Sequence, residues 1–390
     1  MNANKPAKTA MTKLTWGLVI ATYNREKILP ECLKLAIAQT RPPSEIIVVD
    51  ASAHWEATRD RVMAEIASAA LPLRWVYEKA VQPGLTQQRN QGIDRATADV
   101  VFLIDDDSLM YSTCAEEIMR VYEADSGGEV CGVQASLVDQ PPSEVTIADE
   151  RKQTGWSPSQ NLSANRLRRW IWRYLFLMNA EELWIAYDGA MPQHKLPDSI
   201  AQLEVCPMPL FHGCRMTYRR EAIAQTKFES MLWAYASLED LDASYRASQR
   251  GILVEATAAK LHHFNSSSGR LSRYQVSALS ALNQVACLKK YSNNLERDRR
   301  KFYLLMARRI LAELCKDLLS RRWTLPQMRG LLTAWRQADR IFATPSNQLD
   351  QWYPAFQKAL VAGQSLPVAA IAEAINPSNT DLPSQPAKLS

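Results

Sequence analysis

The first hundred residues alternate between two hydrophobic periods. Predominantly apolar runs at 16–21, 45–50 and 100–104 have the length and the β-branched content of buried strands, and residues 73–78 are predicted as a further strand. Between them, apolar residues recur three and four positions apart over about 28–40, 62–69 and 86–98, the spacing of a helix with one buried face. Strands that alternate with helices of this length predict right-handed βαβ crossovers and a largely parallel sheet.

Polar clusters follow three of the predicted strands, at residues 22–25, 50–52 and 105–107. In an open parallel sheet these clusters lie on one rim, at the carboxyl ends of the strands, where ligands bind. Side chains two positions apart in an extended segment point the same way, so Asp105 and Asp107 can converge on one Mg²⁺ or Mn²⁺ ion of the kind a diphosphate carries. The alternative is a polar turn after a core strand, with Asp107 and Ser108 starting the next helix.

A glycine-containing turn at 82–85 separates two of these clusters and predicts a helix that starts at Thr86. The free amides of a helix start and the side chain of Arg89 suit an anion. A dinucleotide enzyme or a nucleotidyltransferase would need a glycine-rich phosphate loop after the first strand, and residues 22–25 contain no glycine.

Taken in this order, residues 14–264 resemble a family 2 glycosyltransferase of the GT-A type. The resemblance is carried by the segments 19–24, 46–50, 84–92, 105–107 and 238–240. It implies a GT-A-type, largely parallel open α/β sheet flanked by helices over 14–265, with a nucleotide-sugar half at about 14–140 and an acceptor half at about 141–265.

The resemblance also implies roles for individual residues. The nucleotide-sugar donor would be contacted by Thr22, Tyr23, Asn24, Arg25, Asp50, Arg89, Asn90, Asp105 and Asp106. Asp105, Asp107 and His262 would hold the metal, Mn²⁺ or Mg²⁺, while Asp240, with Glu239 beside it, would be the catalytic base and Gly213 and Arg215 would line the acceptor side. Family members often carry a second acid after the second strand, where this chain has Ala51, so the nucleotide base stays open.

Two of these assignments compete with structural roles. Ser237 and Asp240 have the spacing of a capping box, so Asp240 is alternatively a helix cap. His262 is preferred over His263 as the metal ligand because it comes first after the last predicted strand, and a surface histidine is the alternative.

From Leu271 onward the pattern is helical only, with predicted helices at 271–292, 295–322 and 324–343. Thr324 and Gln327 form a capping box ahead of the last of these helices. We therefore predict a basic helical subdomain at 270–345. Residues 346–390 are rich in Pro, Ser and Ala and are expected to be a partly disordered tail.

Positive charge is concentrated in the helical subdomain. Residues 270–340 contain 16 Lys+Arg and 5 Asp+Glu, a net charge of +11, whereas the whole chain carries +5. Peripheral contact with anionic lipid headgroups is the simplest implication, with solvated helix faces as the alternative. Nucleic acid is not an expected partner, because no nucleic-acid-binding pattern accompanies the charge.

The segment 165–178 mixes Arg with Trp, Tyr and Phe. It is interpreted as an interfacial membrane helix, as an aromatic cap on the acceptor groove, or as an amphipathic helix packed on the domain. The seven cysteines lack paired metal spacing, and neither a signal peptide nor a spanning helix is predicted. Reduced thiols point to a cytoplasmic protein, peripheral at the inner face of the cell membrane.

The sequence therefore predicts a metal-dependent, inverting glycosyltransferase of the hexosyltransferase type. It would move a sugar from a nucleotide-diphosphate donor to a hydroxyl of a glycan or lipid-linked acceptor, in polysaccharide biosynthesis for the cell envelope. The metal would neutralise charge on the departing diphosphate, Arg89 would add a second cation, and Asp240 would take the acceptor proton. A non-catalytic glycan- or nucleotide-sugar-binding scaffold is the competing hypothesis; the acids at 105, 107 and 240 argue against it and Ala51 argues for it.

Overall fold

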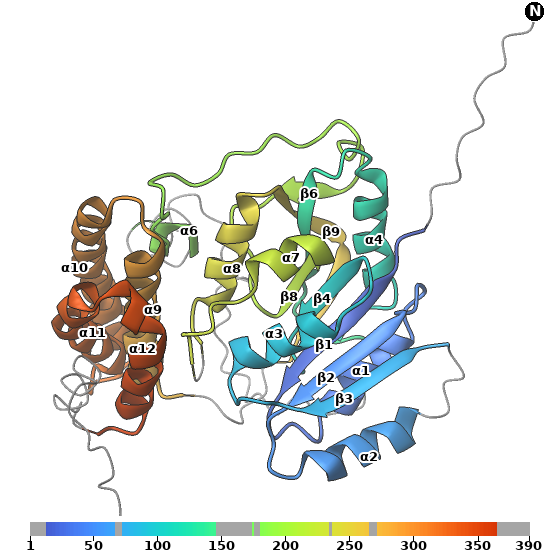
Figure 1. The fold of residues 1–390 in the computed structure, drawn as a ribbon, viewed down its shortest axis with the longest axis horizontal. Coiled ribbons are helices and arrows are strands. Elements are labelled where there is room, and N and C mark those ends of the chain that lie inside the picture. The colour runs from blue at the N-terminus through green and yellow to red at the C-terminus, as the bar shows by residue number, and fades with distance from the viewer. Residues whose placement is uncertain are drawn as a thin grey trace, which may run out of the picture.

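A central nine-stranded sheet is flanked by helices, and a group of four helices stands beside it (Figure 1). This computed structural model describes residues 13–66, 72–145, 180–233, 236–264 and 271–364, together with Tyr174. The predicted class, an α/β sheet with a C-terminal helical part, is confirmed. The Arg- and Trp-rich segment 165–178, apart from Tyr174, lies outside the described residues, as does everything from 365 onward.

The first half of the chain follows the predicted alternation of strands and helices. Its elements are β1 (Trp16–Thr22), α1 (Leu29–Ile37), β2 (Glu45–Asp50), α2 (Trp55–Ile66), β3 (Arg74–Lys79), α3 (Leu85–Arg95), β4 (Val100–Ile104), β5 (Ser108–Met110), α4 (Cys114–Ala124) and β6 (Val130–Leu137). The stretch after β4 is not the start of a helix, because Ser108 opens a short strand instead.

The second half adds strands that run in both directions. Its elements before the helical group are α6 (Ala180–Leu183), β7 (Val205–Pro207), β8 (Arg215–Arg219), α7 (Arg220–Thr226), α8 (Glu239–Ser248) and β9 (Ile252–His263). The strand order is β3-β2-β1-β4-β8-β6-β9-β5, with β7 on β9. The first four strands are parallel as predicted, but β8 is antiparallel to both β4 and β6, so the sheet as a whole is mixed.

Alternating side chains of the central strands fill two apolar cores. On β1, Trp16, Leu18 and Ile20 pack on the face covered by α1, α2 and α4. Val19 points to the opposite face, where it packs with residues of α3, α7 and α8. The runs at 16–21, 45–50 and 100–104 are therefore strands buried on both faces, with their polar carboxyl ends at the rim, whereas β3 is partly exposed.

The four C-terminal helices are α9 (Arg273–Tyr291), α10 (Leu295–Leu319), α11 (Pro326–Ala343) and α12 (Ser346–Val361). The first three lie where the hydrophobic period predicts them. The fourth corrects the predicted tail, because residues 346–361 are helical and bury Leu349, Tyr353, Phe356 and Leu360 on one side. Pro354 lies inside this helix and obscured its period in the sequence.

A third apolar core joins the helical group to the rest of the protein. It contains Leu232, Leu241 and Tyr245 from the region around α8 and buried residues of all four C-terminal helices. All seven cysteines are free thiols. Among the described residues, no helix is both long enough and apolar enough to span a membrane.

Candidate active site

Three side chains form an acidic cluster at the carboxyl end of β4. Asp105 and Asp107 follow this strand, and β5 pairs antiparallel with β9 so that Ser108 lies opposite His263. His263 Nε2 lies 3.0 Å from Asp107 Oδ1 and 3.8 Å from Asp105 Oδ2. One ligand atom from each of the three residues falls within 4.8 Å of the others. Two carboxylates and an imidazole are a donor set that fits Mn²⁺, and Mg²⁺ is compatible with the carboxylate oxygens.

This arrangement corrects the expectation that His262 belongs to the candidate metal site. β9 continues to His263 instead of ending before the histidine pair, and strand alternation turns the two rings to opposite faces. The His262 side chain is buried, with Nδ1 3.0 Å from the carbonyl oxygen of Val138. His263 therefore takes the place assigned to His262.

The protonation of His263 reflects its acidic neighbours. Burial opposes its charged form, but the hydrogen bond to Asp107 and the interaction with Cys214 outweigh burial and raise its pKa to about 10. In the metal-free protein the imidazole is thus protonated at neutral pH and occupies the cation position between the carboxylates.

Asp106 lies between Asp105 and Asp107 in the sequence but makes different contacts from theirs. Thr22 donates a hydrogen bond to its Oδ2 at 2.7 Å, and Arg25 Nε lies 3.9 Å from its Oδ1. Burial and the nearby charge of Asp107 raise the pKa of Asp106 to about 7. Asp106 therefore links the end of β1 to the end of β4, and it is not part of the acidic cluster formed by Asp105, Asp107 and His263.

Arg89 is buried and links the acidic cluster to the start of α8. Its guanidinium is 2% exposed and lies 2.6 Å from Asp105 Oδ1 and 2.6 Å from Glu239 Oε1. It also donates to the carbonyl oxygen of Gly213 at 3.1 Å. These contacts hold Arg89 between Asp105 and Glu239, and its expected contact with a diphosphate stays a prediction.

Glu239 and Asp240 open α8 beside the cluster. Burial raises the pKa of Glu239 to about 8; Arg89 opposes this rise, and Asp240 and Asp105 reinforce it. Asp240 Oδ2 accepts a hydrogen bond from the amide of Gly213 at 2.9 Å, so one glycine contacts both Arg89 and Asp240. The predicted capping box is absent at this helix start, since Leu238 precedes α8 in the left-handed region (φ 73°) without a side-chain cap bond.

The remaining predicted residues divide into exposed and structural ones. Tyr23 is 56% exposed on the rim, next to Asn24, whose φ of 53° lies in the left-handed region that asparagine tolerates. Asp50 is fully buried and accepts hydrogen bonds from the Ser52 amide and the Tyr77 hydroxyl. Tyr23 and Asn24 are therefore the exposed members of this group, and Asp50 is buried.

Asn90 and Arg215 make internal contacts. Asn90 bonds both the amide and the carbonyl of Phe228, each at 2.8 Å. Arg215 pairs with Glu255 at 2.8 Å and donates to the carbonyl of Ala135. Sequence reasoning also missed Gln88, which bonds the carbonyls of Thr22 and Val49 and so joins α3 to the ends of β1 and β2. No pattern in the sequence marks that role.

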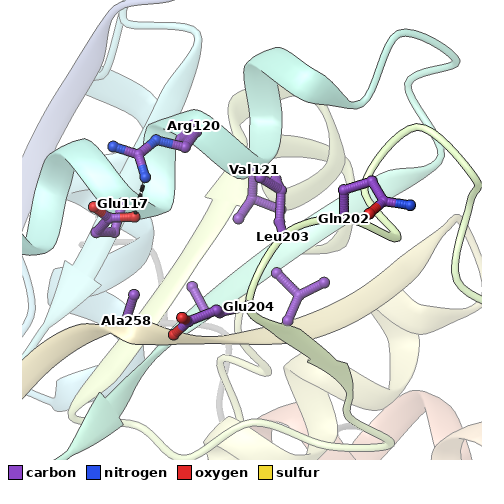
Figure 2. Close-up of a pocket in the computed structure, with 9 residues that line it drawn as sticks. Glu117, Arg120, Val121, Gln202, Leu203, Glu204 and Ala258 are labelled. Atoms are coloured by element: carbon purple, nitrogen blue, oxygen red, sulfur yellow. Dashed lines mark hydrogen bonds and ion pairs between the residues drawn. The ribbon is translucent and has the colours of Figure 1, made fainter.

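A surface cavity of about 280 Å³ lies apart from the acidic cluster (Figure 2). It is lined by Glu117, Arg120, Val121, Gln202, Leu203, Glu204, Val205, Ala256 and Ala258. Arg120 and Glu117 on α4 form an ion pair at 2.8 Å across one side of it. None of the residues predicted to bind donor, metal or acceptor lines this cavity.

Fold and site together define a mixed α/β protein with a candidate divalent-cation site at the carboxyl ends of its strands and an acid-bearing helix start beside it. Residues 18–177 match the glycosyl transferase family 2 model, in agreement with the resemblance seen in the sequence. Over 108 residues the chain is 30% identical to an uncharacterized glycosyltransferase of Haemophilus influenzae, a match that covers 27% of this chain and 34% of that relative's length.

Several solved structures are similar to the chain at low identity. GalNAc-T7 with UDP, GalNAc and Mn²⁺ has a TM-score of 0.49 and 16% identity, over 73% of this chain and 49% of that one. The mannosyltransferase PcManGT from Pyrobaculum calidifontis, in complex with GDP-Man and Mn²⁺, has a TM-score of 0.44 and 17% identity, over 95% and 89%. TarS from S. aureus has a TM-score of 0.40 and 12% identity, over 81% and 55%.

Proposed function

We propose that the protein is an inverting glycosyltransferase that moves a sugar from a nucleotide-diphosphate donor to a hydroxyl of a glycan or lipid-linked acceptor. The observation that carries the proposal is the continuous set of contacts from His263 and Asp107 through Asp105 and Arg89 to Gly213 and Asp240. This set supports the proposal because the candidate metal ligands and the candidate base are both linked by contacts to one buried arginine, Arg89. The family match over residues 18–177 supports the same class of reaction.

In this reaction the acceptor oxygen attacks the anomeric carbon, the bond from that carbon to the phosphate oxygen breaks, and the nucleoside diphosphate leaves with the bonding electrons. Asp240 accepts the proton of the attacking hydroxyl. Asp105, Asp107 and His263 would hold Mn²⁺ or Mg²⁺, which stabilises the negative charge on the leaving diphosphate. Arg89 holds Asp105 and Glu239 in place, so its contribution to the site is orientation and charge balance.

Contact with an anionic membrane and a cytoplasmic location at its inner face are part of the proposal, as is a hexosyl donor used in polysaccharide biosynthesis for the cell envelope. The net charge of +11 over residues 270–340 supports the membrane contact. The competing hypothesis, a binding scaffold without catalysis, predicts donor binding with no turnover.

The decisive experiment is a panel of nucleotide sugars incubated with the protein and Mn²⁺ or Mg²⁺, with release of nucleoside diphosphate as the readout. We expect release with one donor and its loss on chelation of the metal. In Asp107→Asn, which keeps the shape of the side chain but loses its charge, metal-dependent donor binding should disappear while the fold persists. Donor binding without release across the panel would favour the scaffold.

A further inference from the structure

The outward side of α10 carries large apolar side chains exposed to solvent. Leu304, Leu311 and Leu318 are 69%, 57% and 43% exposed, and their spacing of seven residues places them on one side of the helix. Leu319 and Trp323, at 74% and 73%, extend the apolar surface beyond the last turn. Figure 1 places α10 on the side of the helical group that faces away from the sheet. Large apolar side chains exposed together along one side of a helix are typical of an interaction site.

The charges on this side of α10 are positive. Helical geometry places Arg300, Lys301 and Arg308 beside the three leucines, and Arg321 and Arg322 directly precede Trp323. Three of the four carboxylates of α10 lie elsewhere: Asp298 and Asp317 are buried, and Glu313 pairs with Lys316 at 2.8 Å. The fourth, Glu296 in the first turn, is exposed and pairs with Arg300, so it offsets the charge of that residue. Leucines flanked by cations are the composition of a helix that lies in a membrane interface.

We propose that the α10 outer face, made of Leu304, Leu311, Leu318, Leu319 and Trp323 with the basic residues Arg300, Lys301 and Arg308, docks on an anionic lipid bilayer. The leucines and the tryptophan enter the interface between headgroups and acyl chains, and the basic side chains contact the headgroup phosphates. A second copy of the chain fits less well, because pairing two such faces would oppose cations with cations. The inference deepens the proposed membrane contact and is independent of glycosyl transfer.

The test is co-sedimentation of the full chain with phosphatidylcholine vesicles, with and without phosphatidylglycerol, over a salt series and without nucleotide sugar. Wild-type protein should bind the phosphatidylglycerol vesicles, and a salt-resistant fraction should remain because the apolar contact is not screened. In the triple variant Leu304→Ser, Leu311→Ser, Leu318→Ser, affinity should fall by at least roughly tenfold and the salt-resistant fraction should disappear.

A matched control alters the same number of exposed apolar side chains on the α/β part. Met63, Val81 and Leu137 are 37%, 88% and 45% exposed, and their triple substitution by Ser should leave vesicle binding unchanged. A charge variant, Lys301→Gln with Arg308→Gln, should weaken binding to anionic vesicles by about tenfold and flatten the salt dependence.

Three results would overturn the proposal. The first is wild-type protein that stays in the supernatant with anionic vesicles at low salt, and the second is a leucine variant that binds these vesicles as the wild type does. Alternatively, sedimentation would show wild-type dimers that the leucine variant converts to monomers, which would assign the face to a second copy. Vesicle binding by a protein that releases no nucleoside diphosphate would contradict only the proposed catalytic function.

Discussion

At the scale of single residues, Arg89 joins two sets of acids that would otherwise repel each other. One buried guanidinium contacts Asp105 and Glu239, while Asp107 and Asp240 lie next along the chain of contacts. Burial is the largest cause of the raised pKa values of Glu239 and Asp106, and neighbouring carboxylates reinforce it; at His263 burial opposes the charged form, and the hydrogen bond to Asp107 outweighs it. A divalent cation at this site would replace the positive charge of the protonated imidazole.

Metal binding should therefore release protons. A raised pKa for His263 means that its pairing with Asp107 stabilises the fold below the unfolded-state value of 6.5 and that this contribution is lost as pH rises through about 10. Only the neutral imidazole can bind a metal, so titration with Mn²⁺ near neutral pH should release about one proton per site. Calorimetry in buffers of different ionisation enthalpy measures the number of protons released.

The number of released protons should fall to about half near pH 10, the pKa of His263, and toward zero above it, where the imidazole is neutral. Substitution of the exposed His54 by Asn is the control and should change nothing. Manganese binding without proton release near neutral pH would show that His263 is not a ligand.

The catalytic role proposed for Asp240 can be distinguished from its structural role by a single substitution. Asp240→Asn retains an oxygen that accepts a hydrogen bond from Gly213 or Leu241 but cannot take a proton, so transfer should fall by roughly 10²-fold or more while donor affinity changes little. Rates with saturating donor, donor affinity and thermal stability should be measured together. An Asp240→Asn enzyme with near wild-type turnover would leave Asp240 with a structural role only.

Site residues could be predicted where charged residues directly follow a buried strand, but not where the assignment depends on the exact length of a strand. Asp105 and Asp107 came from the sequence because charge directly after a buried strand is conspicuous. His262 was preferred over His263 because the last predicted strand was expected to end before the histidine pair, whereas β9 continues to His263 and strand alternation decides which histidine faces the cluster. The burial of Arg89 depends on Glu239, 150 positions away, and no local pattern reveals that partner.

At the scale of elements, the loop before α8 is held by the C-terminal helices. Ala236 and Leu238 have φ values of 44° and 73°, in the left-handed region that is costly for side chains with a Cβ. Between them, the carbonyl of Ser237 accepts a hydrogen bond at 2.8 Å from Asn283 on α9. Tyr353 on α12 in turn donates to Asn283 at 2.6 Å. The helical group thus fixes the backbone that aims Asp240.

We expect Asn283→Ala to lower kcat by about tenfold and to leave donor affinity unchanged, since the donor-side residues do not contact Asn283. Tyr353→Phe, which removes only the outer hydrogen bond, should have a smaller effect. A loss of donor affinity in step with kcat would indicate general unfolding and would contradict the positioning role.

Helix boundaries show what local patterns miss at this scale. The helices of the C-terminal group were predicted from their apolar period, but the predicted capping box at Thr324 and Gln327 does not form. Asp317 on α10 instead accepts hydrogen bonds from the amides of Gln327 and Met328. The start of α11 is therefore capped by a side chain from the neighbouring helix α10 and not by a local residue. This cap depends on how the two helices pack, which the local sequence pattern does not show.

At the scale of the whole molecule, the α/β part and the helical group meet in a shared core that includes residues of 184–187, 229–233 and 236–245. Gln357 on α12 bonds the carbonyl of Met231 and the amide of Trp233, and Thr86 on α3 bonds the carbonyl of Leu232. The same short segment therefore contacts a helix of each part. The boundary near residue 270 separates two compositions but does not separate two independent cores.

This shared core predicts that the chain unfolds as one cooperative unit. Leu331 on α11 is fully buried, and Leu331→Ala should cost about 2–5 kcal/mol of unfolding free energy by removing apolar contacts and leaving a cavity. Hydrogen exchange should then accelerate in β1 and β4 as well as in α9–α12, because opening either part exposes the common interface. Leu304→Ala, at a position 69% exposed, is the control and should shift stability by no more than about 0.5 kcal/mol. Faster exchange confined to the four C-terminal helices would show instead that they open independently of the sheet, and the support they give to the loop before Asp240 would then be transient.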